Sequence, residues 1–189
     1  MTTTTTTPEP IIRNGVPVHK LFATIGRLRN ESDLAAFRFS ARNRWIEGTA
    51  STSTIHEWHG VGADHTHVRE FEFSADHPTL GLGYGPTPQE YVLHALAACL
   101  TLGIATTAAA RKIELRSVTS TVTGDIDVRG VLGIDAEVRN GFGEIRVEFE
   151  IEADAGADAI TGLVEASKSR SAVYDMLAGE TPIQVGVAA

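Results

Sequence analysis

Cysteine is almost absent from this chain of 189 residues, because Cys99 is the only one. A single cysteine cannot close an intramolecular disulfide, so no disulfide framework holds the fold. The N-terminus lacks the basic start and apolar run of a secretory signal, since Met1 precedes the tract Thr2–Thr7. No stretch approaches the roughly 18 apolar residues that span a bilayer. These absences favour the cytoplasm as the compartment.

An excess of positive charge is also lacking, because the formal net charge is -8. An acidic surface repels phosphate backbones and anionic membranes, so we expect neither a nucleic acid nor a membrane as a partner. No Gly-x-Ser-x-Gly motif is present. The glycines Gly81, Gly83 and Gly85 precede prolines rather than a helix that cradles phosphate, so we expect no nucleotide and no other cofactor.

The composition that remains is that of a globular protein, with 42% hydrophobic and 21% charged residues. The length predicts one main domain. We interpret residues 1–12 as a disordered tail, because they are a threonine tract followed by prolines. Residues 13–36 are interpreted as a helical extension, and residues 37–189 as the main domain.

Apolar residues recur at steps of three and four after Pro17, which predicts a first helix to about Leu28. A further helical turn is expected over 32–36, capped by Ser32. The pattern then changes to a period of two and predicts an antiparallel meander of three strands. Its strands are expected within 37–45, 49–58 and 67–74.

The strongest helix signal runs from Pro88 to about Lys112. Proline suits the first helical position, Thr87 suits the N-cap, and Glu90 stands three residues later, which completes a capping box. The segment 93–110 is apolar nearly all round, so we expect this helix to be buried on most sides.

The last third of the chain returns to strands and short helices. Glu144 to Ala153 alternates cleanly between apolar and charged residues, which is typical of a half-exposed antiparallel strand. Other strands are expected at 117–128, 134–138 and 183–187, and helices at 158–169 and 171–177. Because strands and helices do not alternate as in a parallel sheet, the fold class is α+β.

Three runs of residues stand out: GPTPQEYVLHALAACL over 85–100, GDIDVRG over 124–130 and SAVYDML over 171–177. Together they resemble the OsmC/Ohr family. The resemblance covers roughly residues 37–187. The resemblance implies antiparallel sheets wrapped around a long central helix, and an intertwined homodimer. It also implies an apolar pocket at the subunit interface, with the cysteine at the base of this pocket.

The resemblance also implies thiol chemistry, because members of this family reduce organic hydroperoxides with one cysteine and resolve the product with a second. Here the position of the second cysteine is Ser171, so the resolving thiol is missing. The carboxylate of the family motif falls at Gln89, with Glu90 one residue later. The family arginine is close to Arg44, although a strict register places Ile46 there.

These residues form the candidate catalytic site: Cys99 as the nucleophile, Arg44 or an arginine of the partner subunit as the stabiliser of its thiolate, and Glu90 as the group that orients the arginine. Each has a simpler interpretation. Cys99 is equally explained as a small buried hydrophobic residue, and the capping box by itself accounts for Glu90. Ser171 keeps the hydrogen-bonding capacity of the missing cysteine.

Histidines are the other candidate ligands. Four of them, His56, His59, His65 and His67, lie within twelve residues, and the last two share a strand face. They flank a turn, so we interpret them as solvated surface residues and expect no metal site. His94 lies five residues before Cys99 and therefore some 140° around the helix, which favours a core or dimer contact over a catalytic base.

Two hypotheses of function follow, besides the weaker one of a dimer whose only role is interaction, for which the sequence identifies no partner. The first is a cysteine-based peroxidase that lacks the resolving cysteine and uses an external thiol reductant. The second is a non-catalytic protein of the same fold that binds a small apolar or lipid-like ligand at the dimer interface. The missing second cysteine motivates the second hypothesis.

Overall fold

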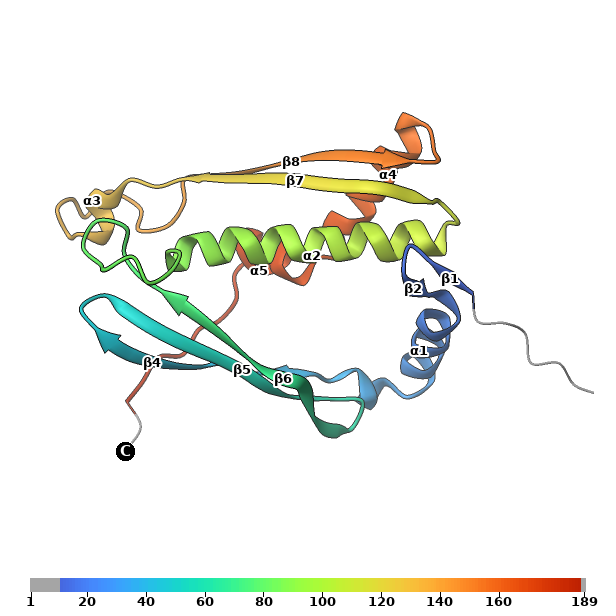
Figure 1. Cartoon of the computed structure of the whole chain (residues 1–189), viewed down its shortest axis with the longest axis horizontal. Coiled ribbons are helices and arrows are strands. Elements are labelled where there is room, and N and C mark those ends of the chain that lie inside the picture. Colours follow the sequence, from blue (N-terminus) through green and yellow to red (C-terminus); the bar gives the residue numbers. More distant parts are fainter. Residues whose placement is uncertain (1–10, 188–189) are drawn as a thin grey trace, which may run out of the picture. The chain divides into compact units, whose positions relative to one another are not determined.

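The computed structural model describes residues 11–187 and divides them into two compact units. The N-terminal unit holds residues 11–12 and 17–92, and the C-terminal unit holds residues 13–16 and 93–187. Figure 1 follows the chain through both. Residues 1–10 of the predicted disordered tail lie outside the described residues.

A hairpin and a helix open the described chain. The strands β1 (Ile12–Arg13) and β2 (Val16–Pro17) are joined by Asn14 and Gly15, which both have positive φ, at 50° and 74°. An Asn-Gly pair is the residue pair that this type of tight turn prefers.

The helix α1 (Val18–Asn30) confirms the predicted first helix, and a 3-10 turn (Ser32–Ala35) follows it. Glu31, rather than Ser32, occupies the N-cap of that turn, and no side chain caps it. The expected cap at Ser32 is therefore wrong.

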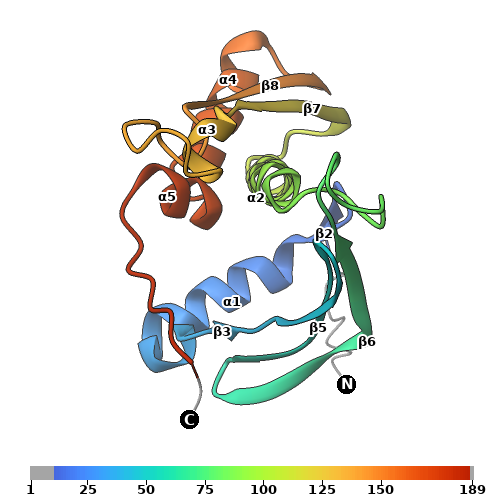
Figure 2. The ribbon, with the colours of Figure 1, turned by 90° about the vertical axis from the view of Figure 1, so that its left-hand side faces the viewer.

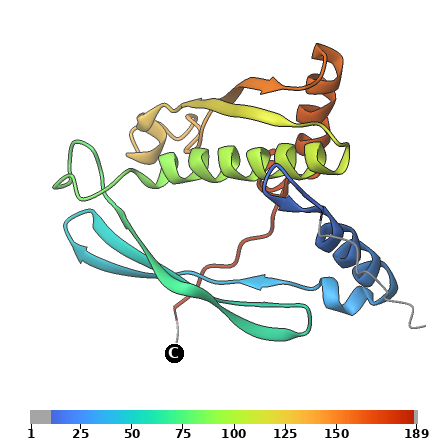
Figure 3. The same cartoon turned by 45° about the vertical axis from the view of Figure 1, so that its right-hand side comes forward.

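The predicted meander is present in the N-terminal unit. The strands β4 (Arg42–Glu47), β5 (Ala50–Gly60) and β6 (Ala63–Ala75) pair antiparallel in chain order, and the short β3 (Arg38–Phe39) pairs with the end of β5. The strand β5 therefore has β3 and β4 along one edge and β6 along the other. Figure 3 shows the long β5–β6 hairpin of this sheet.

The C-terminal unit is built on α2 (Pro88–Ala110), whose bounds match the predicted central helix at its start and within two residues at its end. The remaining elements are β7 (Leu115–Asp125), α3 (Val128–Val131), β8 (Glu144–Ala153), α4 (Ala157–Lys168) and α5 (Ala172–Ala178). The antiparallel pairing of β7 with β8 and of β4 with β5 and β6 confirms the α+β class.

Two expected strands are wrong. Residues 134–138 form a series of turns, because the Ile134 amide closes back on the carbonyl of Arg129 and the Val138 amide on that of Asp135. Residues 183–187 carry an alternating apolar pattern but pair with no strand in the described chain, and Ile183, Val185 and Val187 are 82%, 95% and 99% exposed.

The core of the C-terminal unit lies where α4 and the β7–β8 ribbon meet α2. Ile104, Ala108 and Leu163 are fully buried there, and Phe149 and Ile151 of β8 pack against them. In Figure 2, α2 is seen nearly end-on, with β7–β8 and α5 on neighbouring sides of it. The alternation of β8 is confirmed, since its apolar positions are the less exposed ones.

The helix α2 is buried on one face rather than on most sides. Its buried residues are Leu96, Leu100, Ile104, Ala108 and Ala109. The opposite stripe, His94, Ala98 and Leu102, is exposed in the described chain, Leu102 at 65%. The elements of the C-terminal unit therefore leave an apolar face of α2 uncovered.

By length and composition alone, α2 is apolar enough to cross a membrane, with a mean hydropathy of 1.8 over an 18-residue window. The expectation that no stretch approaches this length is therefore wrong. The criterion is weak, because the core helix of a globular protein also meets it.

Side-chain hydrogen bonds join the hairpin turn at residues 13–16 to the rest of the C-terminal unit. Arg13 donates a hydrogen bond to the carbonyl of Ala109, in the last turn of α2, at 3.0 Å. The Asn14 amide donates to the carbonyl of Ile113 at 2.9 Å and accepts from the Leu115 amide at 3.0 Å. The side chain of Asn14 thus bridges the loop between α2 and β7.

Candidate functional site

The thiol of Cys99 has one polar side-chain partner among the described residues. Cys99 is partly buried on α2, and the hydroxyl of Ser171 donates a hydrogen bond to its sulfur over 3.1 Å. Ser171 itself is 5% exposed. A hydroxyl donor at the sulfur stabilises a negative charge there, whether on a thiolate or on an oxidised sulfur.

The close approach of α4 to α2 positions Ser171. A β-carbon added at Gly103 would lie 2.3 Å from the hydroxyl of Ser167, so glycine is required at this contact. The Ser167 hydroxyl, fully buried, donates to the carbonyl of Leu100 at 2.6 Å. This contact fixes the end of α4 one residue along α2 from Cys99, and the chain reaches Ser171 four residues later.

Ser171 is also the N-cap of α5. Its hydroxyl oxygen accepts a hydrogen bond from the Tyr174 amide at 3.1 Å while its proton is directed to the sulfur. The two hydrogen bonds fix the rotamer of the side chain, and the amide polarises the hydroxyl as a donor. Sequence reasoning found this residue through the resemblance, but it could not place the hydroxyl on the thiol.

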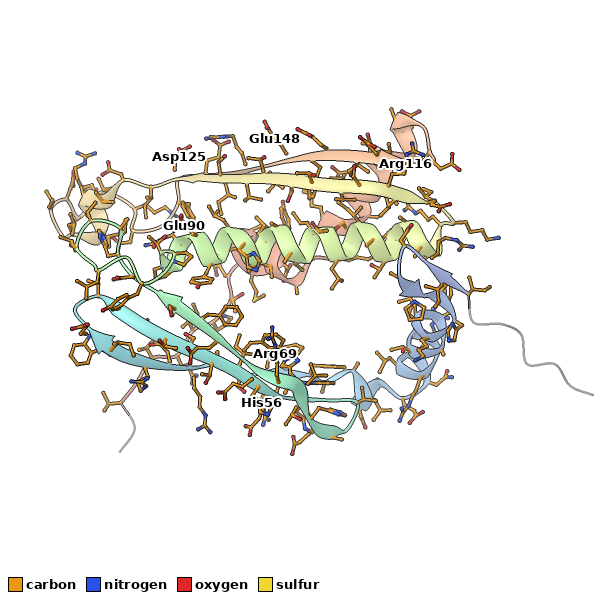
Figure 4. The ribbon with its side chains drawn as sticks, viewed as in Figure 1. His56, Arg69, Glu90, Arg116, Asp125 and Glu148 are labelled. Carbon is orange, nitrogen blue, oxygen red and sulfur yellow. The ribbon has the colours of Figure 1, made fainter. Side chains whose placement is uncertain are left out.

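Glu90 completes the predicted capping box at the start of α2, where Figure 4 labels it. Its Oε2 accepts from the amide of Thr87 at 2.7 Å and from the Thr87 hydroxyl at 3.0 Å, and the Glu90 amide donates back to that hydroxyl at 3.2 Å. These hydrogen bonds from the backbone and side chain of Thr87 lower the pKa of Glu90. Glu90 is therefore ionised at neutral pH.

Arg44 lies on β4, opposite Thr52 of β5, with an exposed side chain. No ion pair of Arg44 is present in the described chain. Of the three candidate catalytic residues, Cys99 belongs to the C-terminal unit, and Arg44 and Glu90 belong to the N-terminal unit. The residue brought to Cys99 within its own unit is Ser171.

Sequence reasoning missed Asp76, which organises the loop before α2. Its carboxylate is 2% exposed and accepts hydrogen bonds from the Thr49 hydroxyl at 2.6 Å and from its neighbour's amide at 2.8 Å. The amides of Leu82, Gly83 and Tyr84 also donate to it, at 2.7, 2.9 and 3.2 Å.

The hydrogen bond from Thr49, followed by those from the backbone amides, lowers the pKa of Asp76 far below its ordinary value against an opposing effect of burial. A β-carbon at Gly81 would lie 2.0 Å from the same carboxylate, which explains the glycine. The glycines of this loop therefore allow its backbone to approach the carboxylate of Asp76.

The clustered histidines have separate roles. The Nδ1 of His59 lies 2.7 Å from a carboxylate oxygen of Asp64, and the Nε2 of His65 lies 3.1 Å from the carbonyl of Gly60. Within residues 11–187, no three His, Cys, Asp or Glu side chains are grouped to hold a metal ion. His94 is exposed in the described chain, so its interpretation as a core residue is wrong, while that as a dimer contact stays a prediction.

Comparison with known proteins gives a consistent result. The family model described as OsmC-like protein matches residues 81–186. The solved structure of an OsmC-like protein from Mycoplasma pneumoniae is 19% identical, with a TM-score of 0.60 over 75% of this chain and 88% of that one.

An OsmC-like protein of unknown function from Vibrio cholerae is 14% identical, with a TM-score of 0.52 over 76% of this chain and 95% of that one. At these identities the likeness concerns the fold. No curated protein matches the chain.

Proposed function

The chain belongs to the OsmC-like family, and on this premise we propose that it is a cysteine-dependent peroxidase that reduces organic hydroperoxides at Cys99. The hydrogen bond from Ser171 to the Cys99 sulfur carries the proposal, because it provides a donor where negative charge accumulates. A cysteine with a purely structural role needs no such donor.

The reaction consumes one hydroperoxide and two thiols. The Cys99 thiolate attacks the terminal peroxide oxygen, the O–O bond breaks, and the alcohol leaves with a proton taken from the medium. Cys99 is left as a sulfenic acid. An external thiol then attacks the sulfur of the sulfenic acid, which releases water and forms a mixed disulfide. A second thiol attacks this mixed disulfide, so that Cys99 leaves as the thiolate and the disulfide of the reductant forms.

Ser171 takes a non-covalent role in this cycle. Its hydroxyl cannot form a disulfide, so it stabilises first the thiolate and then the sulfenate oxygen, and the sulfenic acid persists until an external thiol arrives. The cytoplasm supplies such thiols, and we propose that compartment for the protein.

We propose that Glu90 and either Arg44 or an arginine of the partner subunit act together with Cys99. A guanidinium stabilises a thiolate beside it, and Arg44 has no ion pair in the described chain that would compete for this role. Glu90 uses Oε2 for the helix cap, and its Oε1 is left to orient the arginine. The capping role and the orienting role are thus compatible.

We propose that the protein works as a homodimer. The exposed stripe on α2, with Leu102 at 65%, and the exposed apolar residues of 183–187 need a cover that the C-terminal unit does not supply, and we propose that a second copy supplies it. Sedimentation equilibrium of the full chain is expected to give twice the monomer mass, and Leu102→Glu is expected to shift it to the monomer. A monomeric wild-type protein would refute this assembly.

The test of the activity is the consumption of cumene hydroperoxide in the presence of dithiothreitol. We expect turnover by the wild type and none by Cys99→Ser. The substitution exchanges only sulfur for oxygen, so we expect the variant to fold, and circular dichroism checks this. Equal consumption by the two proteins would overturn the proposal.

A second candidate is the binding of a small apolar or lipid-like ligand without catalysis. It is favoured by the exposed apolar residues of α5 that follow Ser171: Tyr174 is 37%, Met176 49% and Leu177 42% exposed. Native mass spectrometry of the purified protein tests it. A bound lipid together with an inert Cys99 would replace the first proposal by this one.

A further inference from the structure

A polar hollow lies on the sheet of the N-terminal unit, and the proposed peroxidase chemistry does not use it. It encloses about 490 Å³ between β3, β5 and β6, within the range of small-molecule sites. A smaller hollow of about 140 Å³ continues from it along the sheet, and the two share Ser40 and Glu57.

The strand register sets the charged groups of the larger hollow in order. Arg38 is paired with His59, and His59 with Asp64, so the three side chains form one row across β3, β5 and β6. Glu57 lies two residues along β5 on the same face. It is a diagonal neighbour of Arg38, and such neighbours have α-carbons roughly 7–8 Å apart.

The row is held in place by contacts that leave Arg38 and Glu57 without an ion pair in the described chain, although the charge of Arg38 contributes to lowering the pKa of Asp64. His59 and Asp64 are joined by a hydrogen bond of 2.7 Å, which lowers the pKa of Asp64 and keeps it ionised. Trp58 and His65 are the next pair along the two strands, so their rings stack on the opposite face, with ring centres 4.2 Å apart, and stiffen the strand pair that carries the row. The row is thus pre-organised, which reduces the entropy lost on binding.

Opposite charges without partners lie along the two hollows. Arg38 and Glu57 have no ion pair in the described chain, and neither do Arg42 and Glu70 of the smaller hollow. A simple anion or a simple cation would therefore meet like charge as well as opposite charge. A ligand that carries both charges satisfies both sets.

A nitrogen without a partner belongs to a residue of the smaller hollow. His56 lines this hollow, and its Nδ1 atom is shielded from solvent and has no hydrogen-bond partner in the described chain. A buried polar atom without a partner costs free energy that a bound hydrogen-bonding group recovers. Figure 4 labels His56 on this sheet, together with Arg69, which does not line either hollow.

We propose that this face of the sheet binds a small zwitterion of the amino-acid class, with its carboxylate on Arg38 and its ammonium group on Glu57. The carboxylate receives hydrogen bonds from the planar guanidinium, and the ammonium group donates to the carboxylate of Glu57. The remainder of the ligand extends toward His56.

The experiment is an amide NMR titration of the full chain at neutral pH with three probes of matched length. These are 4-aminobutyrate, which carries both charges, and butyrate and butylamine, which carry one each. We expect saturable shifts around the hollow with 4-aminobutyrate and roughly ten-fold weaker binding of the other two, the loss of one charged contact.

The variants Arg38→Gln and Glu57→Gln are expected to weaken the binding of 4-aminobutyrate to the level of the singly charged probes. Arg69→Gln is the matched control, because it removes an arginine of the same sheet outside the hollows, and it is expected to bind like the wild type. Absence of saturable shifts, equal binding of all three probes, or unchanged binding by the Arg38 variant would each overturn the proposal.

Discussion

Gly103 provides the most direct test of how the C-terminal unit positions Ser171. Exchange of glycine for alanine in an exposed helix stabilises a protein by about 1 kcal/mol. At Gly103 the new β-carbon would lie 2.3 Å from the Ser167 hydroxyl and 3.2 Å from the Ser167 α-carbon, so α4 must move. Overpacking of this kind costs about 1–3 kcal/mol.

The displacement also breaks the buried hydrogen bond from Ser167 to Leu100, a further loss of about 1–3 kcal/mol. These losses exceed the gain in helix propensity, so we expect Gly103→Ala to destabilise the protein by about 1–5 kcal/mol in urea unfolding. Ser167→Gly in the same chain should recover part of the loss, because it removes the atoms that clash.

Gly26 provides the matched control. It lies inside α1, and an added β-carbon meets nothing within 4 Å. Gly26→Ala is therefore expected to stabilise the protein by about 0.5–1 kcal/mol. If Gly103→Ala were as stable as Gly26→Ala, the close packing of α4 on α2 and the placement of Ser171 that depends on it would be refuted.

Three other predictions use the same contacts. Because the pKa of Asp76 is lowered on folding, the stability that its carboxylate contributes is complete above the carboxyl pKa of the unfolded chain, about 3.9, and is lost as the pH falls further. The difference in urea midpoint between wild type and Asp76→Asn should therefore be constant above about pH 5 and shrink in acid. A difference that stays constant in acid would contradict the role of the ionised carboxylate. Asn14→Gly keeps the left-handed turn but removes two hydrogen bonds, so we expect a loss of about 1–2 kcal/mol in urea unfolding, and an unchanged midpoint would show that the bridge is dispensable. Ser171→Cys places a second thiol at Cys99, so treatment with hydroperoxide should remove the mass of two hydrogen atoms as a disulfide forms, whereas an oxygen adduct alone would show that the two positions cannot be joined.

The elements that the sequence predicted well are those whose signal is local. The capping box of Thr87 and Glu90 and the clean alternation of β8 are decided by neighbouring residues, and both are confirmed. The Asn14–Gly15 pair is an equally local signal of a tight turn. It is not among the predicted turns, because residues 1–12 are interpreted as a tail and residues 13–36 as a helical extension.

Features that depend on contacts distant in sequence were not predictable in this way. The carboxylate of Asp76 is held by residues on both sides of a long hairpin, and nothing in its neighbourhood marks it as buried. The alternation at 183–187 predicted a strand, but a strand also needs a partner edge, which one chain does not provide. The catalytic assignment of Arg44 stays a prediction for a related reason, since it concerns a contact between the two units or between two chains.

The central claim is that Cys99 is a redox centre activated by the hydroxyl of Ser171. The measurement that tests it most directly is the rate at which cumene hydroperoxide converts Cys99 to a sulfenic acid, trapped by dimedone and read by intact mass, in wild type and Ser171→Ala. The account predicts selective oxidation in the wild type and a rate roughly ten-fold lower in the variant, the equivalent of one charge-assisted hydrogen bond. Equal rates in the two proteins, or a wild-type thiol no faster than free cysteine, would contradict it.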